Sequence, residues 1–202
     1  MTLIDDLTRL DLAVYRAIAL TPTPTLDEPM RRLSDLADHS KLWIAIAAGM
    51  GAFGGRAGRR TAAAGIVAIG LNSAIVNVPI KLGSDRARPD RDAAGVPTAR
   101  HVPMPDSPSF PSGHTASGFA FAAAVASTLP TVAAPLRLLA SAVGYSRVHS
   151  GVHYPGDVVI GALIGTTIGE TVGFLARRIT RRDAAHHHGE ADRPTDAGAG
   201  SS

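Results

Sequence analysis

The chain has 202 residues and a formal net charge of +3, and 45% of its residues are hydrophobic although only 4% are aromatic. That length suits one domain, and the arginines gather at the ends of apolar runs, which argues against a nucleic-acid-binding protein. Because the chain has no cysteine, disulfides and thiolate metal sites are excluded.

The first 40 residues are expected to form helices outside the membrane. Over residues 2–20, leucine and valine recur at helical spacing opposite charged side chains, which is typical of an amphipathic helix lying on a membrane surface. The Thr-Pro repeat at 21–25 predicts a turn. A second polar helix is expected over 27–40, with Pro29 in its first turn.

The rest of the chain predicts an all-α integral membrane bundle of about five to six helices, because uncharged apolar runs alternate with polar connections. The expected spans are 42–55, 61–80, 114–129, 135–148 and 158–176. They place a membrane domain at 41–180, followed by a disordered polar tail at 181–202.

Glycine recurs at every fourth position from Gly161 to Gly173. Small residues at this spacing give a helix a smooth face for close packing. We expect this face to pack within the chain, and a homodimer seam is the alternative.

Two arginine clusters, at 56–60 and 177–182, fall on the same side of the expected spans. The positive-inside tendency makes that side cytoplasmic. The connections 81–113 and 146–156 then meet at the extracytoplasmic side of a multi-pass protein of the cell membrane.

These two connections contain groups suited to holding a phosphate. Lys81, Arg88 and Arg147 supply positive charge. Ser112 stands where the N-cap of the third span is expected, so the N–H groups of Gly113 and the next residue would point out of a helix N-terminus.

The same connections contain groups that can transfer a phosphoryl group. His153 and Asp157 are four residues apart, so the carboxylate can orient one ring nitrogen while the other attacks phosphorus. His114 is then the candidate general acid for the leaving oxygen.

A metal site is the main chemical alternative. Its ligands would come from a wider set: His101, His114, His149, His153 and Asp157. Zinc and iron accept such ligands, but no helix carries a His-x-x-x-His pair and the nearby arginines would repel a cation. We therefore expect neither a metal nor another cofactor.

Three spaced motifs connect these residues. They are Lys81 to Arg88-Pro89, then Pro111-Ser112-Gly113-His114, then Ser146-Arg147 followed by His153 and Asp157. In this order and spacing, the chain resembles the type 2 phosphatidic acid phosphatase (PAP2) superfamily, which includes membrane lipid phosphatases and vanadium haloperoxidases.

The resemblance implies a metal-independent membrane phosphatase that works through a phosphohistidine. His153 would be the nucleophile, Asp157 its orienting partner and His114 the acid. Lys81, Arg88, Ser112, Gly113 and Arg147 would hold the phosphate.

The expected substrate is a phosphorylated membrane lipid: a polyprenyl pyrophosphate, phosphatidic acid or phosphatidylglycerol phosphate. The alternatives are a phosphotransferase of the same fold and a non-catalytic membrane lipid-binding protein. The second is disfavoured because His153 and Arg147 are both present.

Overall fold

The computed structural model describes residues 2–191, and over that range it is helical and contains no strand. The α-helices are α1 (Leu3–Leu20), α2 (Pro24–Leu36), α3 (Lys41–Phe53), α4 (Gly55–Ile75), α5 (Gly113–Ala126), α6 (Ala133–His149) and α7 (Pro155–Ala191). Shorter helical turns are η1 (Asp38–Ser40), η2 (Val76–Ile80), η3 (Thr98–Arg100) and η4 (Pro130–Val132). The all-α fold expected from the sequence is confirmed.

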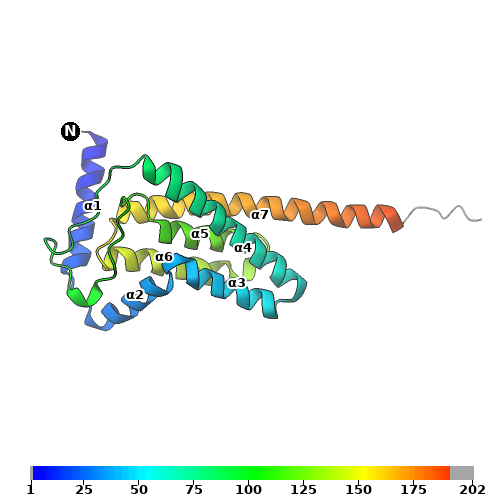
Figure 1. Cartoon of the computed structure of the whole chain (residues 1–202), viewed down its shortest axis with the longest axis horizontal. Helices are drawn as coiled ribbons and strands as arrows, with labels where there is room; N and C mark the ends of the chain where they lie inside the picture. Colours follow the sequence, from blue (N-terminus) through cyan, green and yellow to red (C-terminus); the bar gives the residue numbers. More distant parts are fainter. Residues whose placement is uncertain (1, 192–202) are drawn as a thin grey trace, which may run out of the picture.

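Helices α3 to α7 form an elongated bundle, whereas α1 and α2 lie at one end of it (Figure 1). α5 is central, because it packs on α7, α4 and α6. α7 is the longest helix and continues past the other end of the bundle (Figure 1). The long connection 81–112 returns to the same end as α1 and α2, so the polar segments meet there.

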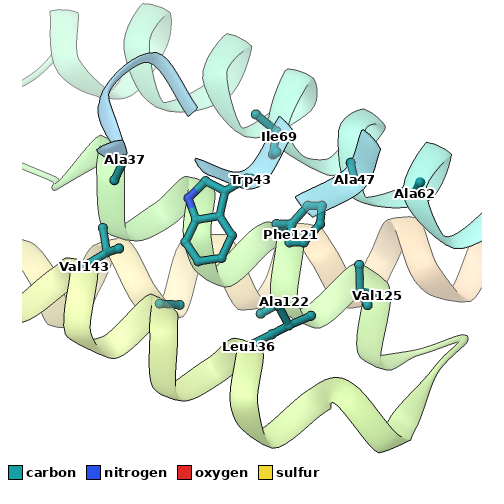
Figure 2. Packing of buried hydrophobic residues seen from close by; sticks show 11 residues of the cluster. Ala37, Trp43, Ala47, Ala62, Ile69, Phe121, Ala122, Val125, Leu136 and Val143 are labelled. Atoms are coloured by element: carbon teal, nitrogen blue, oxygen red, sulfur yellow. The ribbon is translucent and has the colours of Figure 1, made fainter. Parts of the chain in front are cut away.

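The main hydrophobic cluster lies between α3, α4, α5 and α6 (Figure 2). Trp43 of α3 and Phe121 of α5 are both fully buried, and their ring centroids are 5.6 Å apart. Gly118 of α5 leaves room for the indole, since a Cβ there would lie 2.7 Å from Trp43 Cζ2. This cluster fixes α3 against α5, which begins at the end of the bundle where the polar segments meet.

The glycine face of α7 packs directly on α5. A Cβ at Gly165 would lie 2.1 Å from the carbonyl oxygen of Ala116, and one at Gly169 would lie 2.3 Å from that of Ala120. A Cβ at Gly161 would lie 2.6 Å from the carbonyl oxygen of Ser112, directly before α5, and one at Gly173 would collide with the side chain of Ser127, directly after it. The expectation that this face packs inside the chain is confirmed.

Two helices among the described residues are long and apolar enough to cross a membrane, Gly55–Ile80 and Pro155–Thr180, each of 26 residues. The other three expected spans correspond to α3, α5 and α6, which have 13, 14 and 17 residues. A helix of that length covers less than the hydrocarbon core, which is about 30 Å thick.

Several boundaries differ from the sequence prediction. The second polar helix, expected over 27–40, ends at Leu36, because His39 and Ser40 take left-handed φ angles of 50° and 59°. α2 begins at Pro24, three residues before the expected start, because proline is preorganised for the first helical position, and the Thr23 hydroxyl donates to Asp27 at 3.0 Å. α7 runs to Ala191, so residues 181–191 of the expected disordered tail continue the helix. The remainder of that tail, 192–202, lies outside the described residues.

The contact between α5 and α7 predicts a difference between two glycine-to-alanine changes. Both add one methyl to a helix interior and gain about 1 kcal/mol in helix propensity. Gly165→Ala should nevertheless lower the free energy of unfolding by about 1–3 kcal/mol, because its methyl collides with backbone. Gly70→Ala on α4, with nothing within 4 Å, should not. Reversible unfolding in mixed micelles measures both, and equal stability of the two variants would contradict the close packing.

Candidate active site

A cavity of about 550 Å³ lies between the connection 81–112, the start of α5 and the turn before α3. Five of the residues that the sequence assigned to the site line it: Lys81, Arg88, Gly113, His114 and His153. Three others, Ser112, Arg147 and Asp157, are buried behind its wall. Ile44 of α3 and Ile69 of α4 line it as well, so the cavity has a polar part and an apolar part.

His153 lies in the short connection between α6 and α7. The chain turns through Gly151, whose φ of 72° lies in the left-handed region. The Nδ1 atom of His153 lies 3.4 Å from Oδ2 of Asp157, within ion-pair range but without hydrogen-bond geometry. Arg88 Nη1 lies 3.3 Å from Nε2 of His153. Since a guanidinium can only donate, this contact assigns the proton to Nδ1, facing the carboxylate.

Asp157, in the first turn of α7, is completely buried and has several donors around it. Its side chain accepts hydrogen bonds from the Tyr154 N–H at 2.9 Å, from Arg86 Nη1 at 2.8 Å and from the Ser109 hydroxyl. Hydrogen bonds to a carboxylate stabilise its charged form. Asp157 is therefore held as a fixed anion behind His153.

Arg88 and Lys81 bring positive charge to the cavity. Arg88 donates to the carbonyl oxygens of Ser107 and Val152, both at 2.9 Å, so its fork is fixed by backbone. Lys81 Nζ donates to the Ser107 hydroxyl at 3.0 Å. Both cations line the same cavity as His153 and can contact an oxyanion there.

The N-terminus of α5 begins at the cavity, with Ser112 as its N-cap residue as the sequence predicted. The Ser112 N–H donates to the carbonyl oxygen of Asp157 at 3.0 Å, and its hydroxyl accepts from Thr115 at 3.0 Å. The next N–H groups, at Gly113 and His114, have no acceptor in the preceding turn of the helix. They can serve an anion at the positive end of the helix dipole.

His114 is paired with an acid that sequence analysis missed. Its Nε2 lies 3.3 Å from Oδ1 of Asp38 in η1. The chain after Asp38 turns sharply, because His39 and Ser40 have φ of 50° and 59°, in the left-handed region. This turn, between α2 and α3, places Asp38, His39 and Ser40 on the cavity wall.

Arg147 is in the last turn of α6, where it is buried and donates from Nη1 to the hydroxyl of Ser34 in α2. Its Nε is buried and has no hydrogen-bond partner among the described residues. The Nη1 atom of Arg147 is thus held by α2, and its Nε–H can donate to another acceptor.

Of the four histidines of the metal alternative, His114 and His153 line the cavity and the other two lie elsewhere. His149 contacts Thr23 and Asp27 of the α2 region, and His101 bonds the carbonyl oxygen of Val96. Among the described residues, no group of three His, Asp or Glu side chains lies close enough to hold a metal ion.

Four side chains that sequence analysis did not single out support the site: Asp11, Ser34, Asp38 and Arg86. Arg86 bridges Asp157 and Asp11, and Asp11 also accepts from the N–H of Gly156 at 2.7 Å. No spacing in the sequence relates positions 11, 86 and 157. The sequence pointed to Asp38 only weakly, because it is one of several polar residues between a predicted helix and the next apolar run.

The environment of His153 shifts its protonation. Burial lowers its pKa from 6.5 to about 4; the Asp157 carboxylate opposes this effect, while Arg88 and Arg147 add to it. The imidazole is therefore neutral across the range where a free histidine becomes charged, and a neutral ring nitrogen is the nucleophilic form.

Comparison with known proteins identifies the family. Residues 62–178 match the model of the PAP2 superfamily. The chain is 37% identical over 146 residues to the decaprenylphosphoryl-5-phosphoribose phosphatase of Mycolicibacterium smegmatis, covering 71% of this chain and 75% of that protein. The enzyme of the same name from Mycobacterium tuberculosis is 34% identical over 161 residues, covering 76% and 84%.

Solved structures show the same fold. The transmembrane PAP2-type phosphatidylglycerolphosphate phosphatase of Bacillus subtilis superposes with a TM-score of 0.62 at 25% identity, covering 88% of this chain and 87% of that one. Aquifex aeolicus LpxE superposes with a TM-score of 0.64 at 30% identity, covering 81% and 94%.

The fold and its structural neighbours thus define a helical membrane protein with a charged cavity at one end. The chain belongs to the PAP2 superfamily, and within it the chain is a lipid phosphatase.

The lowered pKa of His153 predicts a specific titration. In protein with 13C-labelled histidine, the His153 ring signal, assigned by its loss in His153→Ala, should keep its neutral position as the pH falls from 7 to 5 and shift only near pH 4. Replacing Arg88 by methionine should raise the midpoint, because a cation that disfavours protonation is removed. A wild-type midpoint at or above 6.5 would contradict the buried, cation-flanked environment.

Proposed function

We propose that this phosphatase hydrolyses a phosphomonoester of a lipid-linked headgroup, with His153 as the nucleophile. The observation that carries the proposal is the juxtaposition of the His153–Asp157 pair with two cations and His114 around one cavity. Phosphoryl transfer needs a nucleophile, positive charge on the equatorial oxygens and a proton for the leaving oxygen, and each has a candidate here.

In the first step, Nε2 of His153 attacks phosphorus and the phosphorus–oxygen ester bond breaks. Arg88 exchanges its contact with Nε2 for a phosphate oxygen, and Lys81, the unpartnered Nε of Arg147 and the N–H groups of Gly113 and His114 stabilise the charge. Asp157 keeps the Nδ1 proton in place as the ring becomes positive.

His114 gives its proton to the leaving alcohol oxygen in that step. In the second step, it takes a proton from the water that attacks the phosphohistidine, which releases inorganic phosphate and restores His153. We infer that Asp38 stabilises the protonated form of His114, since its carboxylate faces Nε2 at 3.3 Å.

The relatives favour one substrate class among those open to the sequence. Both mycobacterial enzymes are named for a decaprenylphosphoryl sugar that carries a 5-phosphate. We propose a polyprenylphosphoryl sugar phosphate for this chain as well. The apolar part of the cavity at Ile44 and Ile69 supports an approach of the lipid from between α3 and α4.

We further propose a multi-pass topology with the site on the extracytoplasmic side. The arginines at 56–60 begin α4 and those at 177–178 lie late in α7, at the bundle end away from the cavity. The positive-inside tendency supports a cytoplasmic location for that end.

Phosphate release by purified protein in EDTA tests the function. The substrates are a polyprenylphosphoryl ribose phosphate, phosphatidic acid, phosphatidylglycerol phosphate and a polyprenyl pyrophosphate. We expect release from the first to be fastest, and His153→Ala to lower it roughly 10³-fold or more, because the nucleophile is lost. His101→Ala, outside the cavity, is the matched control.

Three outcomes would contradict this proposal. Unchanged release by His153→Ala would remove the mechanism, and faster release from phosphatidylglycerol phosphate would reassign the substrate. Transfer of phosphate to an added alcohol, with no release in water, would make the protein a phosphotransferase.

The role of Asp38 predicts a dependence on the leaving group. Asp38→Asn should lower kcat for an alkyl phosphate by about 10- to 100-fold, because general acid catalysis by His114 is weakened. For p-nitrophenyl phosphate, whose leaving group needs no proton, the loss should be several times smaller. Parallel kcat measurements on both substrates, in wild type and variant, make the comparison.

Asp35→Asn, one turn earlier on α2 and paired with Arg31, is the control and should change neither rate. An equal loss of kcat on both substrates in Asp38→Asn would show that Asp38 supports the fold of the cavity and does not act through His114.

A further inference from the structure

α1 has an apolar face that the rest of the chain does not cover. Leu3, Leu7, Leu10 and Val14 follow one another at helical spacing, and their exposed fractions are 75%, 56%, 60% and 39%. Asp5, Arg9 and Arg16 lie on the opposite side of the helix. Such a two-sided helix fits the boundary between water and a bilayer.

A third face of α1 packs on the active-site end of the bundle. Tyr15 is buried and its ring meets that of Tyr154 edge-on at 5.4 Å between centroids. Ala19 joins the same cluster. Asp11 accepts from the Gly156 N–H and from Arg86. The second half of α1 is thus fixed to the residues around Asp157, whereas its first half carries most of the exposed apolar side chains.

The direction of α1 matches a surface location. The bundle crosses the membrane along the axis of α4 and α7, and α1 lies crosswise to that axis at the cavity end (Figure 1). A helix in that direction runs in the plane of the membrane surface. The bilayer that holds α4 and α7 is therefore beside the apolar face of α1 without any further partner.

We infer that α1 is seated in the membrane surface next to the active site and holds Arg86 against Asp157 through Asp11. A short series of contacts connects α1 to the proposed catalytic pair. Asp11 of α1 binds Arg86, Arg86 binds Asp157, and Asp157 lies beside His153. The seating of the helix is independent of the proposed function, whereas its effect on the rate rests on the roles of His153 and Asp157.

Seating in the membrane couples lipid contact to the orientation of the nucleophile. Arg86 donates from Nη1 to Asp157 and from Nη2 to Asp11, and its guanidinium lies over the Tyr154 ring, 4.4 Å from the centroid. If α1 leaves the surface, the Asp11 contact is lost and Arg86 is free to move. Asp157 then has one donor fewer to hold it behind the imidazole.

The absence of native cysteine allows the position of α1 to be measured with one nitroxide label at a time. Leu7→Cys and Arg16→Cys variants are labelled and placed in phosphatidylcholine–phosphatidylglycerol nanodiscs. Relaxation by oxygen, which concentrates in lipid, is compared with relaxation by a water-soluble nickel chelate. We expect oxygen to dominate at position 7 and the nickel chelate at position 16.

Two results would overturn the seating. Stronger relaxation by the nickel chelate at both positions would place α1 in water. Shielding of position 7 from both reagents, with dipolar broadening between labels, would assign the apolar face to a second copy of the chain.

A double-mutant cycle tests the coupling to the active site. Leu7→Gln/Leu10→Gln should lower kcat in nanodiscs roughly threefold or more, whereas the matched pair Ala13→Gln/Arg16→Gln, on the exposed charged side, should not. In an Asp11→Asn background the leucine changes should not lower kcat further, because the ion pair between Asp11 and Arg86 is already lost.

Additive losses in that cycle would show that α1 and the catalytic pair are independent. If wild-type protein releases no phosphate from any substrate, the proposed function fails, and the nitroxide measurements still decide where α1 lies.

Discussion

The structure depends on the position of one buried carboxylate, that of Asp157. Its side chain accepts from the connection 81–112 through Arg86 and Ser109, and from the turn before α7 through the Tyr154 N–H. Its backbone carbonyl accepts from the N-cap of α5. A buried anion is stable only when its oxygens are satisfied, so the segments that supply these donors must assemble together. The same contacts place the carboxylate beside the ring of His153.

The close approach of α5 and α7 makes this assembly possible. The contact between the Ser112 N–H and the Asp157 carbonyl joins the first turns of two helices, and it requires their axes to be near one another at that end. The glycines of α7 allow it, since a side chain at Gly161 would meet the Ser112 carbonyl oxygen at 2.6 Å. The packing of small residues and the geometry of the candidate site are therefore one constraint, because both require α5 and α7 to lie close together at the cavity end.

The sequence could predict the parts of the site that are fixed by local spacing. His153 and Asp157 are four residues apart, and Ser112 to His114 mark a helix start, so these groupings follow from short stretches of sequence. Contacts that join distant segments could not be found this way. Asp11 meets Arg86 across 75 positions, and Asp38 meets His114 only because two left-handed residues turn the chain before α3. Arg147 was expected at the phosphate, yet its fork is partly used by Ser34 of α2.

The N-terminal segment therefore contributes more to the site than its place outside the three motifs indicates. A buried network of Arg100, Asp27 and His149 fixes α2 to η3 and α6, and Arg100 also binds carbonyl oxygens at the end of α1. These charges are paired and hydrogen-bonded, as burial requires. The cavity wall at Asp38, and the Ser34 hydroxyl that binds Arg147, are therefore supplied by residues that precede α3. His149 and His153 are only four residues apart, yet they have different surroundings. His149 contacts Thr23 and Asp27 of the α2 region, whereas His153 lines the cavity.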